Sequence, residues 1–329
     1  MLIKHRLLHP PELLDLFNDY WQNVKIADKP GRLYAAVQYM MNMGGKRLRP
    51  VLLLLTNNMF DHTMEHAMRA ASGIELFHNF TLIHDDIMDR APLRRGRATV
   101  HEKYGSSTAI LAGDVMMVVA SSFMGELCRI VTGDIFEVFN NAALEVCEGQ
   151  QLDMEFESEN NVSPAAYIEM IGKKTAALMA SSVQIGALLG GATQRDVDLL
   201  GMFGRKTGIS FQLMDDILDT YGEPGKFGKK MGGDILCNKK TYLLTMALQM
   251  AEGSRKEQLH FCLENDVPPD EKIATVKSIY DALELRKIAE EEMMRYFGQA
   301  QQHLSEVDLP ADRKEIMKQF TTGLLSRSQ

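Results

Sequence analysis

Two apolar segments of this chain end in the same acidic pattern. The segment from Phe77 to Ile83 leads into Asp85-Asp86-Ile87-Met88-Asp89, and Phe211 to Met214 leads into Asp215-Asp216-Ile217-Leu218-Asp219. On an α-helix, residues four apart share a face, so the first and last aspartate of each pattern point the same way. Burying unpaired carboxylates is costly, so these groups require metal ions, basic partners or water. The fold must therefore bring each acidic helix end to a polar site.

The charges nearby indicate which ligand such a site would bind. Two acidic helices facing each other would line one cavity with the carboxylates of both patterns. Mg²⁺ suits this cavity because it binds a few carboxylates, keeps waters and takes its other ligands from substrate phosphates. Arg94, Arg95 and Arg97 follow the first pattern and provide donors for phosphate oxygens. A lone pattern would more often be a solvated helix end, but the second copy favours a metal-bridged phosphate site.

The composition limits which binding partners and which cellular compartment are expected for this protein. The 329 residues are 45% hydrophobic, enough for a large core, and the net charge of −8 argues against nucleic acid or an anionic membrane as the main partner. The four cysteines lie far apart, which indicates thiols in a reducing compartment. No secretory signal is visible. The uncharged segment 175–194 is rich in Ala, Gly and Ser, so we expect a buried helix, no membrane span and a cytoplasmic protein.

Helical periodicity runs through almost the whole chain. We expect helices over the following segments: 10–24, 33–43, 48–60, 63–89, 107–131, 135–156, 163–190 and 194–221. Three or four more should follow position 233. Asp134 and Ser163 stand where N-caps would begin two of these helices. No two-residue alternation persists, so a sheet is not expected. The predicted class is all-α, with no linker dividing residues 1–329 into separate domains.

Basic residues gather in two further places. The run Gly44-Gly45-Lys46-Arg47-Leu48-Arg49-Pro50 puts backbone amides and three cations at a helix start, which suits an anion site and equally an ordinary basic turn. Lys174 stands at the edge of the uncharged segment. Four lysines flank Gly232-Gly233-Asp234 after the second acidic pattern: Lys229, Lys230, Lys239 and Lys240. Loop lysines are usually solvated, and only their place beside that pattern suggests a binding role.

Together these motifs resemble those of the trans-isoprenyl diphosphate synthases, the polyprenyl synthetases that make farnesyl, geranylgeranyl and longer diphosphates. The resemblance runs from Gly44 to about Thr241 and is loose over the last hundred residues. In the family's order it comprises GGKRLRP, LIHDDIMD followed by LRRG, GQQLD with a later KT pair, FQLMDDILD and GKKMGGDILCNKKT. It implies a single-domain bundle of antiparallel helices around a deep central cavity, with the acidic helices facing each other, and a homodimer.

The resemblance also implies a role for each group. Asp85, Asp89 and Asp215 correspond to Mg²⁺ ligands, and three Mg²⁺ would bridge them to the diphosphate of an allylic substrate. Supporting aspartates are Asp86, Asp216 and Asp219. The residues that correspond to ligands of the allylic diphosphate are Arg94, Lys174, Lys229 and Lys239, with Lys230 an alternative to Lys229. Gln212 would lie near the carbocation, and Thr175 follows the paired lysine.

A second, metal-free pocket is implied for isopentenyl diphosphate. Its residues correspond to Lys46, Arg49, His78 and Arg95. A helix histidine is more often a hydrogen-bonded core residue, so the assignment of His78 rests on the resemblance alone. Gln150 and Asp153 correspond to a pair near the active site, and Arg327 would close over the isopentenyl pocket.

The implied reaction needs no obvious side-chain base. Mg²⁺ and the cations would stabilise the charge on the departing pyrophosphate, the double bond of isopentenyl diphosphate would attack the allylic carbocation, and pyrophosphate would take the proton. The growing chain would pass Phe77, Phe80 and Thr81, residues that periodicity alone assigns to the core. In the family, an aromatic five residues before the first aspartate limits elongation, and Phe80 holds that place. We predict a short-chain product, geranylgeranyl (C20) ahead of farnesyl (C15).

Two alternatives remain at this point. A class I terpene cyclase is also helical and uses Mg²⁺, but it would have a different second metal motif and no isopentenyl pocket. A non-catalytic subunit would keep the fold and partner an active synthase, although it has no need of intact acidic motifs. Activity of the purified chain alone separates these possibilities. An apolar stretch such as 115–119 offers an interface for the homodimer.

Overall fold

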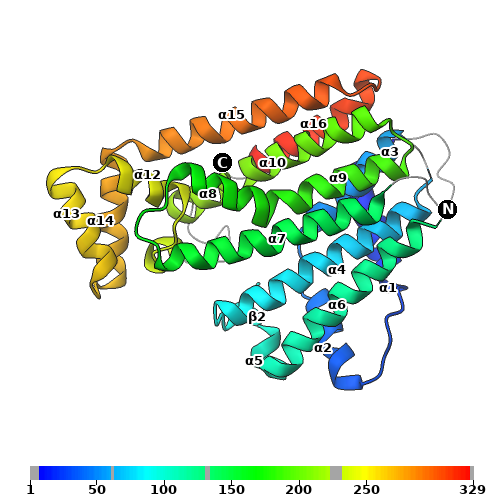
Figure 1. Cartoon of the computed structure of the whole chain (residues 1–329), viewed down its shortest axis with the longest axis horizontal. Coiled ribbons are helices and arrows are strands. Elements are labelled where there is room, and N and C mark those ends of the chain that lie inside the picture. The colour runs from blue at the N-terminus through cyan, green and yellow to red at the C-terminus, as the bar shows by residue number, and fades with distance from the viewer. Residues whose placement is uncertain (1–6, 61–62, 130–133, 223–231, 327–329) are drawn as a thin grey trace. The chain divides into compact units, whose positions relative to one another are not determined.

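The computed structural model describes residues 7–60, 63–129, 134–222 and 232–326, and these residues are almost entirely helical, as Figure 1 shows. The predicted all-α class is therefore confirmed. Lys229, Lys230 and Arg327 lie outside the described residues.

The chain divides into two compact units, whose boundaries fall within helices. Unit 1 comprises Met1–Ala142, Leu178–Gly201 and Glu306–Met317, and unit 2 comprises Ala143–Ala177, Met202–Ser305 and Lys318–Gln329. The single domain stays a prediction.

Unit 1 is centred on helix α4 (Glu65–Met88), which packs against α3 (Leu48–Phe60) and α6 (Ser106–Leu127), as Figure 1 shows. A Cβ on Gly73 of α4 would lie 2.8 Å from the Met124 side chain of α6, so the absence of that atom permits the close contact. The other helices of this unit are α1 (Pro10–Gln22), α2 (Gly31–Met41), α5 (Val100–Tyr104), the start of α7 (Ile135–Ser158), nearly all of α9 (Ala177–Leu189), the start of α10 (Gln194–Tyr221) and the start of α16 (Ala311–Ser326).

A small hairpin follows α4, where no sheet was expected. Strands β1 (Leu93–Arg94) and β2 (Arg97–Ala98) pair antiparallel, with Arg94 opposite Arg97. The two residues between them, Arg95 and Gly96, have φ of 53° and 74°. A two-residue hairpin turn of this kind needs positive φ at both positions, which glycine adopts freely and arginine only under constraint. Strands of two residues are too short for alternation to show in the sequence.

Unit 2 contains the remaining helices. They are the rest of α7 and α10, α8 (Pro164–Ile171), α11 (Gly233–Leu236), α12 (Tyr242–Met250), α13 (Gly253–Glu264), α14 (Pro269–Ala282), nearly all of α15 (Leu285–Glu306) and the end of α16 (Ala311–Ser326). Its apolar core includes Tyr167, Leu213, Leu244 and Tyr280. The expectation of three or four helices after position 233 was wrong, because extended residues at Ala251–Glu252 and Pro268 divide this region into shorter helices.

The helix predicted over 163–190 is also interrupted. Between α8 and α9 the backbone forms a π-helical segment, Gly172–Ala176, which carries Lys174 and Thr175. Gly149 of α7 lies against it: a Cβ there would be 2.2 Å from the backbone nitrogen of Lys174. Single π-turns within helices are common at functional sites. The π-helical segment thus contains Lys174, whose side chain is predicted to bind substrate.

Both predicted N-caps are present. The backbone N–H of Glu137 donates to Asp134 Oδ1 at 3.3 Å at the start of α7. The backbone N–H of Ala166 donates to Ser163 Oγ at 3.1 Å at the start of α8, with Pro164 in the first turn. These local signals therefore fixed helix starts correctly.

Among the described residues, α6 is the one helix long and apolar enough, by length and composition, to cross a membrane. The segment 175–194, which the sequence singled out, does not pass the same test. Helix α6 carries Asp114 and packs against α2, α4 and α5. One such helix does not indicate a membrane span.

Candidate active site

The first acidic pattern lies at the C-terminal end of α4. The helix ends at Met88, but the Asp89 N–H donates to the Asp85 carbonyl at 2.8 Å, so helical geometry continues through Asp89. Asp85 and Asp89 thus lie one turn apart, the first partly buried and the second exposed. These two carboxylates are accessible to a metal ion in water.

Asp86 is buried and bound by an arginine. Arg94 Nε lies 2.9 Å and 2.8 Å from the two Asp86 carboxylate oxygens, and Arg94 Nη2 lies 2.8 Å from Asp86 Oδ1. The same Nη2 is 3.6 Å from Asp85 Oδ2. Burial raises the pKa of Asp86, and the hydrogen bonds from Arg94 oppose that rise. Asp86 therefore holds the Arg94 guanidinium beside the first acidic pattern.

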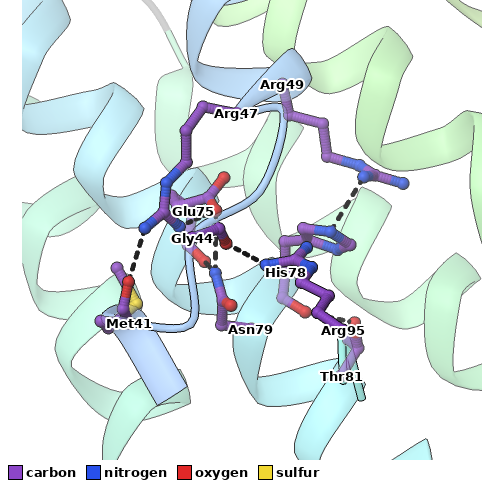
Figure 2. Close-up of polar contacts among 9 residues, drawn as sticks. All are labelled: Met41, Gly44, Arg47, Arg49, Glu75, His78, Asn79, Thr81 and Arg95. Carbon is purple, nitrogen blue, oxygen red and sulfur yellow. Dashed lines mark hydrogen bonds and ion pairs between the residues drawn. The ribbon is translucent and has the colours of Figure 1, made fainter. Parts of the chain in front are cut away.

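Three of the predicted isopentenyl diphosphate residues, Arg49, His78 and Arg95, lie close together beside the earlier turns of α4, as Figure 2 shows. Arg49 Nη1 lies 3.2 Å from His78 Nε2, and Arg95 donates to the Gly44 carbonyl. Lys46 is exposed in the loop between α2 and α3. Gly45 has a φ of 132°, and a Cβ there would lie 2.6 Å from the Arg95 guanidinium. Only glycine permits this close approach of Arg95 to the loop.

His78 is electrostatically suited to an anion-binding surface. Burial and the positive charges of Arg49, Arg95, Arg94 and Arg47 lower the pKa of His78 well below its ordinary value. The imidazole is thus neutral at pH 7 and accepts or donates a hydrogen bond according to its tautomer. Arg47 and Arg94 are paired with Glu75 and Asp86, so Arg49 and Arg95 beside the neutral histidine supply the positive charge that favours diphosphate.

The second acidic pattern has a similar arrangement within unit 2. Asp215 is exposed, Asp216 is buried and Asp219 is partly buried. Asp216 accepts hydrogen bonds from the Tyr167 hydroxyl at 2.5 Å, Gln212 Nε2 at 3.1 Å and the Tyr242 backbone N–H at 3.4 Å. Burial nevertheless raises the pKa of Asp216 to about 7. In both patterns, the second carboxylate is bound by protein groups.

Neighbouring elements of unit 2 bring further predicted residues together. Lys174 Nζ is 2.6 Å from Asp153 Oδ2, and the Thr175 hydroxyl donates to Gln212 Oε1 at 3.0 Å.

Helix α11 and the short connection that follows it are bonded to α10 and to each other. The backbone N–H of Asp234 donates to Asp219 Oδ2 at 3.0 Å, and the Lys239 N–H donates to the Asp234 carbonyl at 2.9 Å. Lys239 is exposed on this short connection, and its charge lowers the pKa of Asp216 against the larger effect of burial. Because the two acidic patterns belong to different units, their facing arrangement stays a prediction.

Several residues of the site went unrecognised in the sequence. Arg47 and Glu75 form a buried ion pair beneath the basic loop, and Tyr167 binds Asp216. Glu75 did carry a signal, since a lone carboxylate within the apolar middle of α4 requires a partner. Tyr167 carried none, because an aromatic residue at helical spacing is most simply a core residue.

The donor set fits Mg²⁺. Asp85, Asp89 and Asp215 provide hard carboxylate oxygens that are exposed or partly so. No group of three or more His, Cys, Asp or Glu side chains suited to a metal occurs among the residues that the structure describes. Mg²⁺ does not require such a group, because it typically binds one or two carboxylates and takes its remaining ligands from water and substrate phosphates.

Comparisons with known proteins agree on one family. The sequence model described as polyprenyl synthetase matches residues 30–283. A geranylgeranyl diphosphate synthase of Sulfolobus acidocaldarius is 35% identical over 317 residues, which cover 94% of this chain and 96% of that protein. A geranylfarnesyl diphosphate synthase of Natronomonas pharaonis is 37% identical over 273 residues, 77% of this chain and 78% of that protein.

Solved structures give the same result. A crystal structure of geranylgeranyl pyrophosphate synthase superimposes with a TM-score of 0.91 at 36% identity and covers 98% of this chain and 100% of that one. The likeness therefore extends over the whole fold.

Proposed function

This chain belongs to the polyprenyl synthetase family and is a short-chain prenyltransferase, and from that premise we propose the reaction it catalyses. It condenses isopentenyl diphosphate head to tail with an allylic diphosphate (dimethylallyl, geranyl or farnesyl) and releases pyrophosphate. The product is an all-trans prenyl diphosphate, with C20 ahead of C15.

One observation carries this proposal. Helix α4 bears accessible carboxylates at its end and, three turns earlier, the polar face on which the basic loop lies. Arg94 and Arg95, adjacent in the hairpin, contact these two places separately: Arg94 binds Asp86, and Arg95 binds the Gly44 carbonyl. A metal-dependent anion site and a metal-free anion site on one helix suit a reaction between two diphosphates.

The residues of the basic loop bind isopentenyl diphosphate in this proposal. Lys46, Arg49 and Arg95 neutralise its diphosphate, and neutral His78 adds a hydrogen bond without a further charge. No metal ligand lies in this loop, so the diphosphate of this substrate is held by direct ion pairs. This fixes the double bond of the attacking substrate relative to α4.

Members of this family generally use Mg²⁺ together with isopentenyl and allylic diphosphates. Here Asp85, Asp89 and Asp215 would hold the ions, three of them when the allylic diphosphate is bound. When bound, Mg²⁺ stabilises the charge that develops on the leaving pyrophosphate. Lys174, Arg94 and Lys239 supply positive charge to the same group, while Thr175 and Gln212 form a polar pair near the carbocation.

In this proposal, the aromatic residues of α4 limit the length of the prenyl product. Phe80 lies between Phe77 and His84, with ring centroids 5.4 Å and 4.8 Å away, so its ring has little freedom to move aside. A fixed ring one turn before Asp85 would stop a short prenyl chain, with the small Thr81 leaving more room than a second aromatic. The relatives that make geranylgeranyl and geranylfarnesyl diphosphate support a short-chain product.

The assembly and location complete the proposal. We propose a cytoplasmic homodimer, with the exposed apolar face of α6 as its interface. Val118 of the expected stretch 115–119 is 68% exposed on that face, whereas Met116 is buried.

The deciding experiment incubates the purified chain with isopentenyl diphosphate, Mg²⁺ and one of the three allylic diphosphates, and reads product length by mass spectrometry. We expect C15 or C20 product that disappears with EDTA and falls by at least about 10³-fold in Asp85→Ala, since the substitution removes a metal ligand. No condensation with any primer would overturn the proposal in favour of a non-catalytic subunit. Cyclised hydrocarbon from an allylic diphosphate alone would indicate a terpene cyclase.

A further inference from the structure

A buried ion pair lies beneath the basic loop. Arg47 Nη1 binds Glu75 Oε1, and their side chains are only 7% and 3% exposed. Arg47 Nη2 donates to the Met41 carbonyl at 2.5 Å, at the end of α2. The Arg47 side chain therefore links the end of α2 to the middle of α4, as Figure 2 shows. None of these contacts involves the positions assigned to either substrate.

Glu75 is held in place from its own helix. Asn79, one turn later, donates through Nδ2 to Glu75 Oε1 at 2.9 Å and to the Glu75 carbonyl at 2.8 Å. Among the described residues, no hydrogen-bond partner reaches Glu75 Oε2 or Asn79 Oδ1, although both atoms are buried. Arg47 is thus the cation that compensates this carboxylate, and losing either partner leaves a buried charge alone.

The backbone at Arg47 explains why an anchored side chain is needed there. Arg47 has a φ of 45°, in the left-handed region that side chains other than those of Gly, Asn and Asp adopt rarely. Such a conformation persists only where its surroundings impose it. Arg47 stands between Lys46 and Arg49, so its backbone sets the directions in which these two cations project. Two contacts of the guanidinium hold it.

We propose that the Arg47–Glu75 ion pair is a positioning device for the isopentenyl diphosphate pocket. It does not bind substrate; it imposes the loop conformation that directs Lys46 and Arg49 toward the diphosphate. His78 lies on the same face of α4 as Glu75, three residues on, so one helix face supports the loop and also contacts Arg49. This inference rests on the proposed function for the identity of the anion.

The first test replaces Glu75 by Gln, which keeps the shape and removes the charge. We expect the KM for isopentenyl diphosphate to rise about tenfold or more, because misplaced cations bind the diphosphate poorly. The KM for the allylic diphosphate, bound at the acidic patterns, should stay within about twofold. A uniform fall in kcat with both KM values unchanged would overturn the proposal.

Because Glu75→Gln leaves Arg47 buried without a counter-charge, a second variant separates positioning from stability. In Arg47→Met/Glu75→Gln no charge is buried, and replacing a buried ion pair by uncharged side chains is often neutral or stabilising. The thermal midpoint should return toward that of the wild type while the KM for isopentenyl diphosphate stays high. Recovery of that KM together with stability would show a merely structural role.

A matched control removes a more exposed ion pair, which joins α4 to α6. Arg69 and Glu126 pair at 2.7 Å with side chains 30% and 51% exposed, so Glu126→Gln should leave both KM values unchanged. Calorimetric titration of isopentenyl diphosphate into metal-free protein measures the pocket without turnover. An inactive wild-type chain would refute the proposed reaction, whereas equal affinities of the wild type and Glu75→Gln in this titration would refute the positioning role.

Discussion

At the scale of single residues, the middle aspartates of the two acidic patterns differ from their neighbours. Asp86 and Asp216 are 2% and 3% exposed, and each accepts several hydrogen bonds from protein groups. The outer carboxylates remain accessible. The different partners matter: Asp86 is compensated by the charge of Arg94, whereas Asp216 is bound mainly by neutral donors. Asp216 should therefore be the carboxylate whose ionisation costs more in the metal-free protein.

This difference predicts a pH dependence of stability. The pKa of Asp216 is raised from 3.8 to about 7, so folding favours its protonated form. The stabilisation it provides is full below pH 3.8 and is lost as the pH rises through about 7. Asp216→Asn stays neutral, so the stability of the variant relative to wild type should rise between pH 5 and 7, by at most about 1.4 kcal/mol per pH unit. Urea unfolding of both proteins in EDTA measures this stability difference as a function of pH. A difference that does not change with pH would contradict the prediction.

The aromatic residues of α4 give a second prediction at this scale. Phe77 is fully buried between Phe80 and Phe139, whereas Phe80 is only partly buried. Phe80→Ala should therefore lengthen the product by at least one isoprene unit and leave the reaction intact. Mass spectrometry of products formed from farnesyl diphosphate tests this, with Phe261→Ala, an exposed phenylalanine of α13, as the control. An unchanged product length would remove Phe80 from the elongation limit.

How much of the site can be predicted from the sequence depends on whether the partners of each residue lie close to it in the chain. Asp85, Asp89 and Asp215 are predicted metal ligands, because a repeated acidic pattern on apolar helices is rare without a ligand and the family resemblance singles out these three positions. Arg47 and Glu75 were not recognised as a pair, since 28 residues separate them and their contact depends on how the loop folds back on α4. The same holds for Tyr167 and Asp216, 49 residues apart. Local spacing predicts residues on one helix face and leaves such long-range partners undetermined.

At the scale of elements, the break between α8 and α9 is the informative departure from the predicted helices. Propensity favours a continuous helix, and nothing in residues 172–176 forbids one. The π-helical turn accompanies a contact with Gly149 of another helix, so the sequence of the segment alone could not reveal it. The N-caps at Asp134 and Ser163 were predictable for the opposite reason: each is made by residues three apart.

Gly149→Ala should consequently impair the presentation of Lys174 and Thr175. The new Cβ would lie 2.2 Å from the Lys174 backbone nitrogen, and backbone cannot yield as a flexible side chain does. We expect kcat/KM for the allylic diphosphate to fall by about 10²-fold, the effect of misplacing a catalytic group by about 1 Å.

The matched control is Gly298→Ala in α15 of the same unit, where nothing lies within 4 Å of the added atom. That variant should keep full activity and gain about 0.5–1 kcal/mol of stability from the better helix propensity of alanine. Steady-state kinetics and thermal unfolding of both variants test the pair of expectations. Equal activity of the two alanine variants would show that the π-helical turn does not depend on Gly149.

At the scale of the whole molecule, the uncovered face of α6 requires an explanation. Ile110, Leu111 and Val118 are 44%, 55% and 68% exposed, although α6 is otherwise packed against α2, α4 and α5. Monomeric proteins rarely leave such apolar side chains together on one helix without a partner. Asp114 lies among them and argues against lipid as that partner, because a carboxylate in the middle of a membrane span is costly. We propose that a second copy of the chain covers this face, which would shield the apolar side chains without burying the helix in a bilayer.

The dimer is tested by placing a charge on this face. Val118→Lys should shift the assembly to monomers in light scattering at micromolar concentration, since a lysine buried against its symmetry mate in a twofold interface brings two like charges together. Met294→Lys on α15, where the methionine is 53% exposed, provides an equal change of charge on an exposed apolar residue elsewhere and should leave the mass unchanged. A dimer that survives Val118→Lys would place the interface elsewhere. Because α6 packs on α4, which carries Phe80 and Asp85, a monomer that also made products of altered length would show that the contact between copies constrains the elongation limit.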